Sequence, residues 1–199
     1  MNELLTLLSI QMHPQLLLHS PPADEQLLKT YLRVKPLLHT PHAAEAVRIL
    51  GAREVEIVPP FPSSETERLF RYEQVFGPTA SNIEVFEQTM TAPIANALQG
   101  YNSTVFIYGM TGAGKTYTMF NAPSKLGGGT GLVGLTLRRL FEQLVVAQGK
   151  FQVALSFYEI YNENIRDLLS DSALPLAILE VPGRGVVISD LRELAVESV

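Results

Sequence analysis

Apolar residues follow a helical period in the middle of this chain. The pattern starts behind Ser81-x-x-Glu84, a capping box of the kind that begins helices, and ends at Gly100. The spacing predicts one helix over 82–99, with an apolar face of Ile83, Phe86, Met90, Ile94 and Ala97. A second helix is predicted after a glycine-rich loop at 125–131, with an apolar face of Val133, Leu137, Leu140, Phe141, Leu144 and Val145.

Strands are predicted on both sides of these helices. Alternating or apolar runs indicate strands at 31–34, 54–58, 104–108 and 151–160, and a strand or turn at 70–76. The run 104–108 has the apolar character of a buried strand. A short helix is predicted at 162–169, and a hairpin at 181–199 that turns at 183–185. Strands that alternate with helices predict an α/β fold with a central sheet.

Composition narrows the class of protein. The 199 residues are 46% hydrophobic and 18% charged, which excludes a chain that is disordered throughout. The net charge of −5 provides no global basic field for nucleic acid. The chain has no cysteine, so disulfide scaffolds and thiolate zinc sites are excluded.

The N-terminal residues 1–28 are interpreted as an extension that ends in a proline break. Its apolar start lacks the basic residues of a secretory signal, because Asn2 and Glu3 stand in their place. No segment offers the roughly twenty apolar residues that a membrane helix needs. We therefore expect a protein of the cytosol without membrane insertion.

One motif carries recognisable chemistry. The consecutive residues Gly109, Met110, Thr111, Gly112, Ala113, Gly114, Lys115 and Thr116 match the phosphate-loop pattern G-x-x-x-x-G-K-[ST], directly after a predicted strand. The glycines let the backbone curl so that successive N–H groups point inward, and a following helix adds its N-terminal dipole. Lys115 then offers a cation to the β and γ phosphates, and the Thr116 hydroxyl can ligate Mg²⁺.

Around this loop the sequence resembles the kinesin motor family. Residues 108–119 read Y-G-M-T-G-A-G-K-T-Y-T-M, similar to the family pattern Y-G-x-T-x-x-G-K-T-[HY]-T-M. Residues 32–36 resemble its R-x-R-P strand, and 70–76 its F-x-F-D-x-V-F segment. Residues 100–104 resemble G-Y-N-[GS]-T, and 157–169 its E-I-Y-N-E-x-I-x-D-L-L block. The resemblance runs from about residue 30 to 199, and 31–37 are reminiscent of the mitotic, cytokinesis-associated branch.

This resemblance implies a fold and an activity. The implied fold is a kinesin-type phosphate-loop core with a central, mostly parallel sheet and helices on both faces, spanning residues 29–199. The implied cofactors are ATP and Mg²⁺, the implied partner is the microtubule, and the implied location is the cytoplasmic cytoskeleton. Arg33 and Pro36 match the residues that line the adenine side, and Tyr117 stands where the family places an aromatic ring near the base.

The sequence also departs from the family. Lys35 replaces the second arginine of R-x-R-P, which keeps the charge and loses the planar stacking surface. Gly134 and Leu135 replace the proline and arginine of the G-I-I-P-R helix start. The switch patterns N-x-x-S-S-R-S-H and D-x-x-G-x-E occur nowhere in the chain. We expect an incomplete motor that exposes the apolar strand 104–108, binds nucleotide and hydrolyses it poorly.

Other interpretations stay open. Asp190 ends an apolar run as a Mg²⁺-binding acid does, but the resemblance places it in a hairpin. Glu159 and Glu163 are interpreted as solvated or hydrogen-bonded carboxylates, and the four histidines as loop residues, namely His13, His19, His39 and His42. The main alternative function is a non-motor interaction or regulatory module. A phosphate-loop kinase or GTPase is a third interpretation, which the wider motif context argues against.

Overall fold

The computed structural model describes residues 28–36, 46–58, 68–121, 130–146, 152–172, 174–183 and 185–197. The predicted extension 1–28 lies almost entirely outside these residues, as do the four histidines and most of the predicted loop 125–131. The described segments belong to two compact units, one within Ser20–Thr89 and the other within Met90–Val199. Each unit has its own buried apolar residues.

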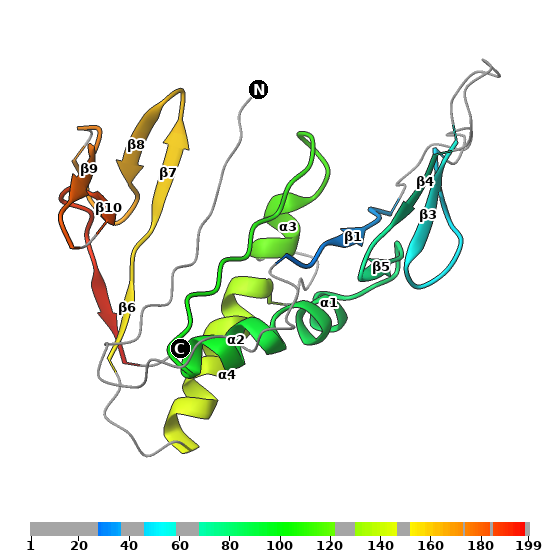
Figure 1. Ribbon diagram of the computed structural model, residues 1–199, viewed down its shortest axis with the longest axis horizontal. Coiled ribbons are helices and arrows are strands. Elements are labelled where there is room, and N and C mark those ends of the chain that lie inside the picture. The colour runs from blue at the N-terminus through cyan, green and yellow to red at the C-terminus, as the bar shows by residue number, and fades with distance from the viewer. Residues whose placement is uncertain are drawn as a thin grey trace. The chain divides into compact units, whose positions relative to one another are not determined.

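The first unit combines a parallel strand pair with a small antiparallel sheet (Figure 1). Strand β1 (Tyr31–Arg33) pairs in parallel with β5 (Gln74–Phe76). Strands β2 (Val47–Ile49), β3 (Glu54–Ile57) and β4 (Arg68–Arg71) form the antiparallel sheet in the order β2-β3-β4. The predicted strands 31–34 and 54–58 are confirmed, and 70–76 divides between β4 and β5. Among the described residues of this unit, the buried apolar side chains are those of Val55, Val75, Phe76, Val85 and Phe86.

Cross-strand ion pairs cover one face of the antiparallel sheet. Arg48 and Glu56 are direct partners across β2 and β3, and their side chains meet at 2.5 Å. Arg71 and Glu54 are partners across β3 and β4, at 2.7 Å. Because side chains alternate along a strand, both pairs lie on the face opposite the buried Val55.

Helix α1 (Asn82–Thr89) begins with the predicted capping box. The backbone N–H of Glu84 donates to Ser81 Oγ at 3.2 Å, and the Ser81 backbone N–H donates to Glu84 Oε2 at 2.6 Å. The Ser81 hydroxyl donates to the same carboxylate oxygen at 2.8 Å. These hydrogen bonds from the Ser81 backbone and hydroxyl hold the pKa of Glu84 below its ordinary value.

The prediction of one continuous helix over 82–99 is wrong. The chain forms α1 and then α2 (Thr91–Leu98), with Met90 between them at φ −104° and ψ −17°. Pro93 explains the break, because it has no N–H to donate to the Thr89 carbonyl and its ring would crowd that carbonyl. Ile83 is 61% exposed, whereas four of the five predicted apolar positions are buried, namely Phe86, Met90, Ile94 and Ala97.

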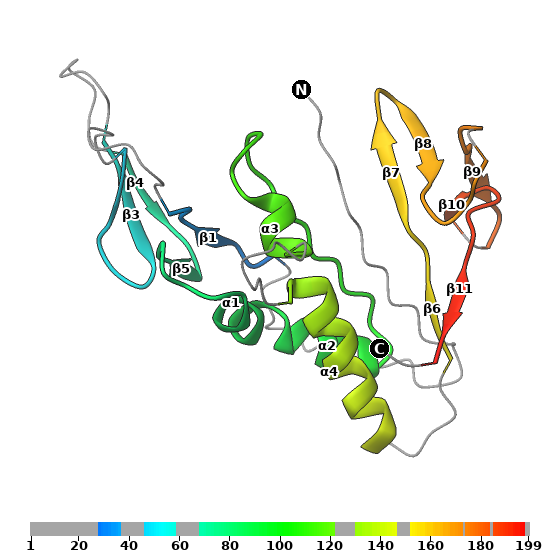
Figure 2. The ribbon, with the colours of Figure 1, turned by 180° about the vertical axis from the view of Figure 1, so that it is seen from behind.

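Three helices build the core of the second unit (Figure 2). They are α2, α3 (Lys115–Met119) and α4 (Leu132–Val146). The predicted face of α4 is confirmed at Leu140 and Leu144, while Val145 is 79% exposed and Thr136 is buried instead. The Thr136 hydroxyl is accommodated there because it donates to the Leu132 carbonyl at 2.7 Å. Within the described residues, no helix combines the length and apolar character needed to span a membrane.

The predicted buried strand 104–108 is absent. The structure assigns no strand to residues 101–110, and in the described part of the chain no ladder pairs with them. Their side chains alternate between half-buried and exposed, with Phe106 at 58% and Tyr108 at 83% exposure. A strand needs a hydrogen-bonded neighbour to exist, so this apolar run stays a single extended segment.

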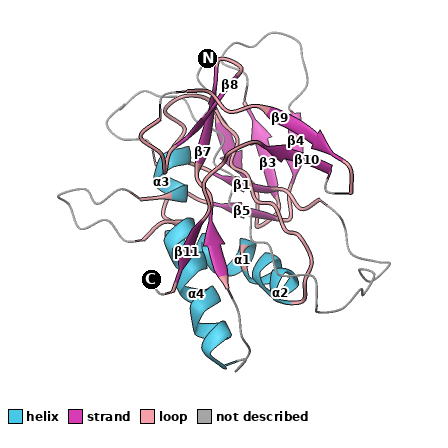
Figure 3. Ribbon diagram, turned by 90° about the vertical axis from the view of Figure 1, so that its left-hand side faces the viewer, coloured by secondary structure: helices cyan, strands magenta, loops and turns pink. Residues whose placement is uncertain are grey.

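The C-terminal part consists of short antiparallel pairs (Figure 3). Strand β6 (Val153–Leu155) pairs with β11 (Leu194–Val196), and β9 (Ile178–Val181) forms a hairpin with β10 (Gly185–Ile188). The hairpin therefore spans 178–188 and not the predicted 181–199. Strand β7 (Tyr158–Tyr161) pairs with β8 (Asn164–Asp167).

The predicted helix 162–169 is therefore wrong. Asn162 and Glu163 have φ of 48° and 65°, the left-handed backbone that a two-residue hairpin turn requires. The α/β character of the fold is confirmed. The described strands form five small sheets, in which β1 and β5 are the parallel pair, in place of the expected central, mostly parallel sheet.

We predict that Glu84 stabilises α1 in a pH-dependent way. Because its pKa is lower in the folded chain, its contribution is complete above the ordinary value of 4.5 and is lost as the pH falls through the lowered folded value. Glu84→Gln should therefore lower the thermal midpoint at pH 7, and the difference from wild type should vanish in acid. Glu193→Gln, the same charge change at an exposed residue outside α1, is the control. An equal, pH-independent loss in both variants would contradict the prediction.

Candidate functional site

The phosphate-loop motif forms a tight glycine turn between the extended segment and α3 (Figure 1). Gly112 and Gly114 have φ of 83° and 98°, in the left-handed region that favours glycine. A Cβ added at either residue would meet no atom within 4 Å, so there is open space beside the backbone. The Ala113 N–H donates to the Met110 carbonyl at 3.0 Å and closes the turn.

Lys115 folds back over this turn. Its Nζ donates to the Gly109 carbonyl at 2.5 Å and to the Met110 carbonyl at 3.2 Å. The side chain is half-buried, so its ammonium group is held at the turn instead of extending into solvent. The loop thus keeps a positive charge beside its own open backbone.

The other motif side chains face outward. Met110, Thr111 and Ala113 are exposed, and so is Thr116, whose hydroxyl is accessible at the start of α3. Tyr117 is 55% exposed. Open space beside left-handed glycines, a tethered ammonium and an accessible hydroxyl fit the phosphates of a nucleotide and a hard cation such as Mg²⁺.

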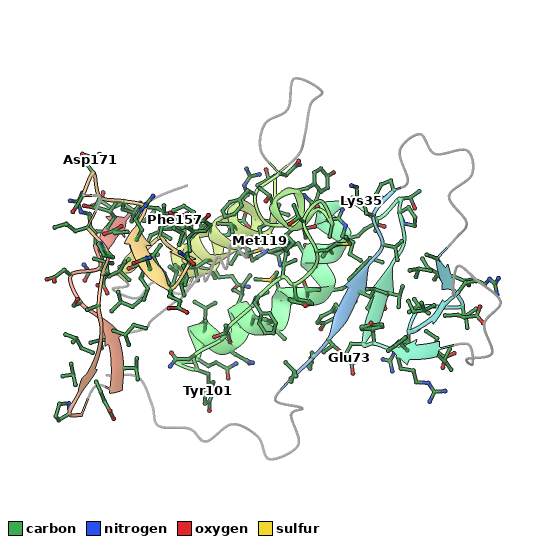
Figure 4. All side chains as sticks on the ribbon, turned by 90° about the horizontal axis from the view of Figure 1, so that it is seen from above. Lys35, Glu73, Tyr101, Met119, Phe157 and Asp171 are labelled. Atoms are coloured by element: carbon green, nitrogen blue, oxygen red, sulfur yellow. The ribbon has the colours of Figure 1, made fainter. Side chains whose placement is uncertain are left out.

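Apolar contacts hold the C-terminal end of helix α3 in place. Met119, labelled in Figure 4, is 7% exposed. It lines one apolar cavity with Ile94 of α2 and Leu132 of α4. Phe120, just after the helix, makes an edge-to-face contact with Phe157 at a ring separation of 6.0 Å. The buried end of α3 therefore positions its exposed beginning.

Gly131 lets α4 approach α3 closely. A Cβ at this position would lie 2.4 Å from the Met119 carbonyl oxygen and 2.5 Å from the Phe120 carbonyl carbon. Both neighbours are backbone atoms, so they cannot rotate away. Only glycine fits where the chain enters α4.

Comparison with known proteins identifies the family. A profile of the kinesin motor domain matches residues 33–199. This chain belongs to the kinesin motor domain family. The match includes both described units.

Individual relatives agree with this assignment. Kinesin-like protein KIN-8B of Arabidopsis thaliana is 32% identical over 182 residues, which cover 86% of this chain and 22% of that protein. Kinesin-like protein cut7 of Schizosaccharomyces pombe is 38% identical over 158 residues, covering 74% of this chain and 15% of that protein. The chain thus spans about a fifth of the length of the curated relatives that it matches.

A solved structure of a fast kinesin resembles this chain as well. The two superpose with a TM-score of 0.75 at 29% sequence identity, over 86% of this chain and 49% of the other. The kinesin motor fold is therefore present here in part.

In this kinesin chain, Arg33 and Pro36 lie in the first unit, at and just beyond the end of β1. The Arg33 guanidinium donates from Nη1 to Asn82 Oδ1 at 2.6 Å and from Nη2 to the Ala80 carbonyl at 2.9 Å. Pro36 is exposed. Sequence reasoning missed Asn82 as a partner of Arg33, since the two residues are 49 positions apart and no local pattern connects them.

The remaining acidic candidates lie in the C-terminal strands and their turns. Glu159 forms a salt bridge with Arg166 across β7 and β8 at 3.3 Å, which agrees with its interpretation as a solvated or hydrogen-bonded carboxylate. Glu163 is exposed in the hairpin turn, and Asp190 is exposed at a φ of 56° in the turn after β10. Among the described residues, no three histidine, aspartate or glutamate side chains gather at metal-binding distance.

We predict that Gly131→Ala loosens α3 from α4. The added methyl group would overlap backbone atoms, and overpacking of this kind costs about 1–3 kcal/mol. Hydrogen–deuterium exchange should become faster at the amides of α3 and of the first turn of α4. Gly51→Ala is the matched control, because a Cβ there would meet no atom within 4 Å. Unchanged exchange in α3 of the Gly131 variant would show that the close approach is unimportant.

Proposed function

We propose that this chain forms the ATP-binding part of a kinesin motor and that residues 109–116 bind the phosphates of Mg·ATP. The observation that carries the proposal is the tethered Lys115 ammonium beside the open backbone of Gly112 and Gly114. Carbonyl oxygens are weak partners for an ammonium group compared with charged phosphate oxygens. A bound phosphate would therefore replace the Gly109 and Met110 carbonyls as its acceptor.

The loop contributes three kinds of group in this proposal. The backbone N–H groups of the glycine turn bind phosphate oxygens, and Lys115 neutralises charge on the β and γ phosphates. Thr116 supplies its accessible hydroxyl to Mg²⁺. The metal ion, when bound, neutralises phosphate charge and orients the triphosphate. Lys115 and Thr116 are the residues of this chain closest to the chemistry.

The adenine side is assigned by resemblance. Arg33 and Pro36 match the family residues that flank the base, and Tyr117 matches the aromatic position beside it. A guanidinium and an aromatic ring both offer flat faces on which a base stacks. The exposure of Tyr117 and Pro36 supports this role, since a buried side chain could not reach a ligand.

Nucleotide binding and hydrolysis are separate properties in this proposal. The two switch patterns that sense the γ-phosphate in kinesins do not occur in this sequence. Without residues that position the attacking water, the phosphate loop alone binds nucleotide and accelerates hydrolysis little. We expect slow turnover by these 199 residues.

The partner in this proposal is the microtubule, in the cytoplasmic cytoskeleton. Support comes from family membership over residues 33–199 and from the kinesin-like relatives. In the family, the region after the E-I-Y-N-E block contacts β-tubulin. Strands β9 and β10 follow that block here, and they expose Ile178 and Val186.

We predict micromolar binding of Mg·ATP to the purified chain, measured by calorimetry. Lys115→Ala should abolish the binding, because it removes the ammonium group that pairs with the phosphates. Arg138→Ala removes an exposed positive charge on α4 of the same unit and should leave binding unchanged. Equal affinity in wild type and the Lys115 variant would exclude the loop as the site.

We also predict that the chain co-sediments with microtubules in a nucleotide-sensitive way. A motor fragment couples the two ligands, so the bound fraction should differ between Mg·ATP and Mg·ADP. Lys115→Ala is again the control, since it should remove the nucleotide effect. If the bound fraction is the same with Mg·ATP and Mg·ADP, the result would favour the non-motor interaction module instead.

A further inference from the structure

The extended segment 103–108 joins α2 to α3 within the second unit and presents backbone groups that can pair with another strand. It belongs to no ladder, and no hydrogen bond joins its backbone to another described residue. On one side, Ser103 and Val105 line the apolar cavity together with Met119 and Leu132. The helices therefore hold this segment extended on one face, while its N–H and C=O groups remain available along its edges.

The opposite face of the segment is exposed and largely apolar. Phe106 is 58% exposed and Tyr108 is 83% exposed, and Thr104 is exposed in the same row. Because side chains alternate along an extended chain, these three residues form one stripe. Residues 104–108 are all β-branched or aromatic, which are the side chains that favour strands.

The sequence lacks the features that protect an exposed strand edge against pairing. Natural edges carry charged side chains, prolines or bulges that disfavour contact with a second strand. Here no charged residue occurs between Glu87 and Lys115, and no proline occurs between Pro93 and Lys115. A charged partner would therefore find no opposite charge on this segment. A second copy of the segment is uncharged as well, so the two edges meet without repulsion.

We propose that segment 104–108 pairs with the same segment of a second copy of this chain, in an antiparallel ladder centred on Phe106. Thr104 then faces Tyr108 of the other copy. Val105 likewise faces Ile107, and the two Phe106 residues face each other across a two-fold axis. Exposed side chains meet exposed ones and half-buried side chains meet half-buried ones, so both copies keep their helices on the same side of the ladder.

This arrangement predicts a dimer of defined size. Aromatic and β-branched pairs across neighbouring strands stabilise a sheet. A two-fold axis makes the contact the same for both copies, so the assembly closes at two chains. Since the segment is already held extended, little chain entropy is lost when the copies pair. The dimer is independent of the proposed binding of nucleotide and microtubules.

The test measures the oligomeric state of the full chain by sedimentation over a series of concentrations. Wild type should change from monomer to dimer as the concentration rises. Phe106→Lys and Phe106→Glu each place two like charges opposite each other at the axis, so each should weaken the dimer by at least about tenfold. An equimolar mixture of the two variants should dimerise again, because lysine then faces glutamate. Recovery in the mixture also shows that both variants are folded.

Two controls locate the interface. Val145→Lys adds the same charge at a residue of α4 that is 79% exposed, and it should leave the dimer unchanged. Amide hydrogen exchange needs no variant. In wild type, exchange at 104–108 should become slower as the concentration rises through the dimer transition.

Several results would overturn the proposal. A wild-type chain that stays monomeric would leave this edge to a strand of a different polypeptide, and larger assemblies in place of a dimer would exclude the two-fold contact. A dimer in which 104–108 exchange as fast as in the monomer, or which only Val145→Lys disrupts, would place the interface elsewhere. A mixture of the two Phe106 variants that stays monomeric while wild type dimerises would exclude the ladder centred on Phe106.

Discussion

The close approach of Gly131 to the last turn of α3 determines where the phosphate loop can lie. Helix α3 is short, and its own hydrogen bonds could not hold it in place. Its buried end is fixed instead by the backbone of Gly131, by Met119 in the apolar cavity, and by the contact between Phe120 and Phe157. The loop at its exposed end therefore projects from a packed support, as a preorganised anion site needs.

Electrostatics adds a second constraint at the loop. A backbone rich in inward-pointing N–H groups attracts anions, and a lysine close to it would repel other cations. The Lys115 ammonium group donates hydrogen bonds to the Gly109 and Met110 carbonyls, so the loop holds its own cation. Phosphate oxygens are stronger acceptors than these carbonyls, which gives a physical reason for the exchange of partners in the nucleotide binding that we propose.

The first unit uses charge in a different way. Its ion pairs between Arg48 and Glu56 and between Arg71 and Glu54 connect neighbouring strands of a small sheet. Arg33 donates hydrogen bonds to the Asn82 amide oxygen and to the Ala80 carbonyl, and so connects β1 with the start of α1. Both arrangements depend on contacts between residues far apart in the chain.

Local features of this protein were readable from the sequence. The capping box at Ser81 and Glu84, the glycine positions of the phosphate loop and the family itself follow from short motifs, because each depends on residues within a few positions of one another. The break before Pro93 was also a local signal, which the apolar period over 82–99 outweighed in the prediction. Tertiary structure decided the rest. Residues 104–108 are not a strand because no described strand pairs with them, and 164–167 form β8 instead of a helix because they pair with β7. The partner of Arg33 is 49 residues away, so only the folded chain could bring Asn82 to it.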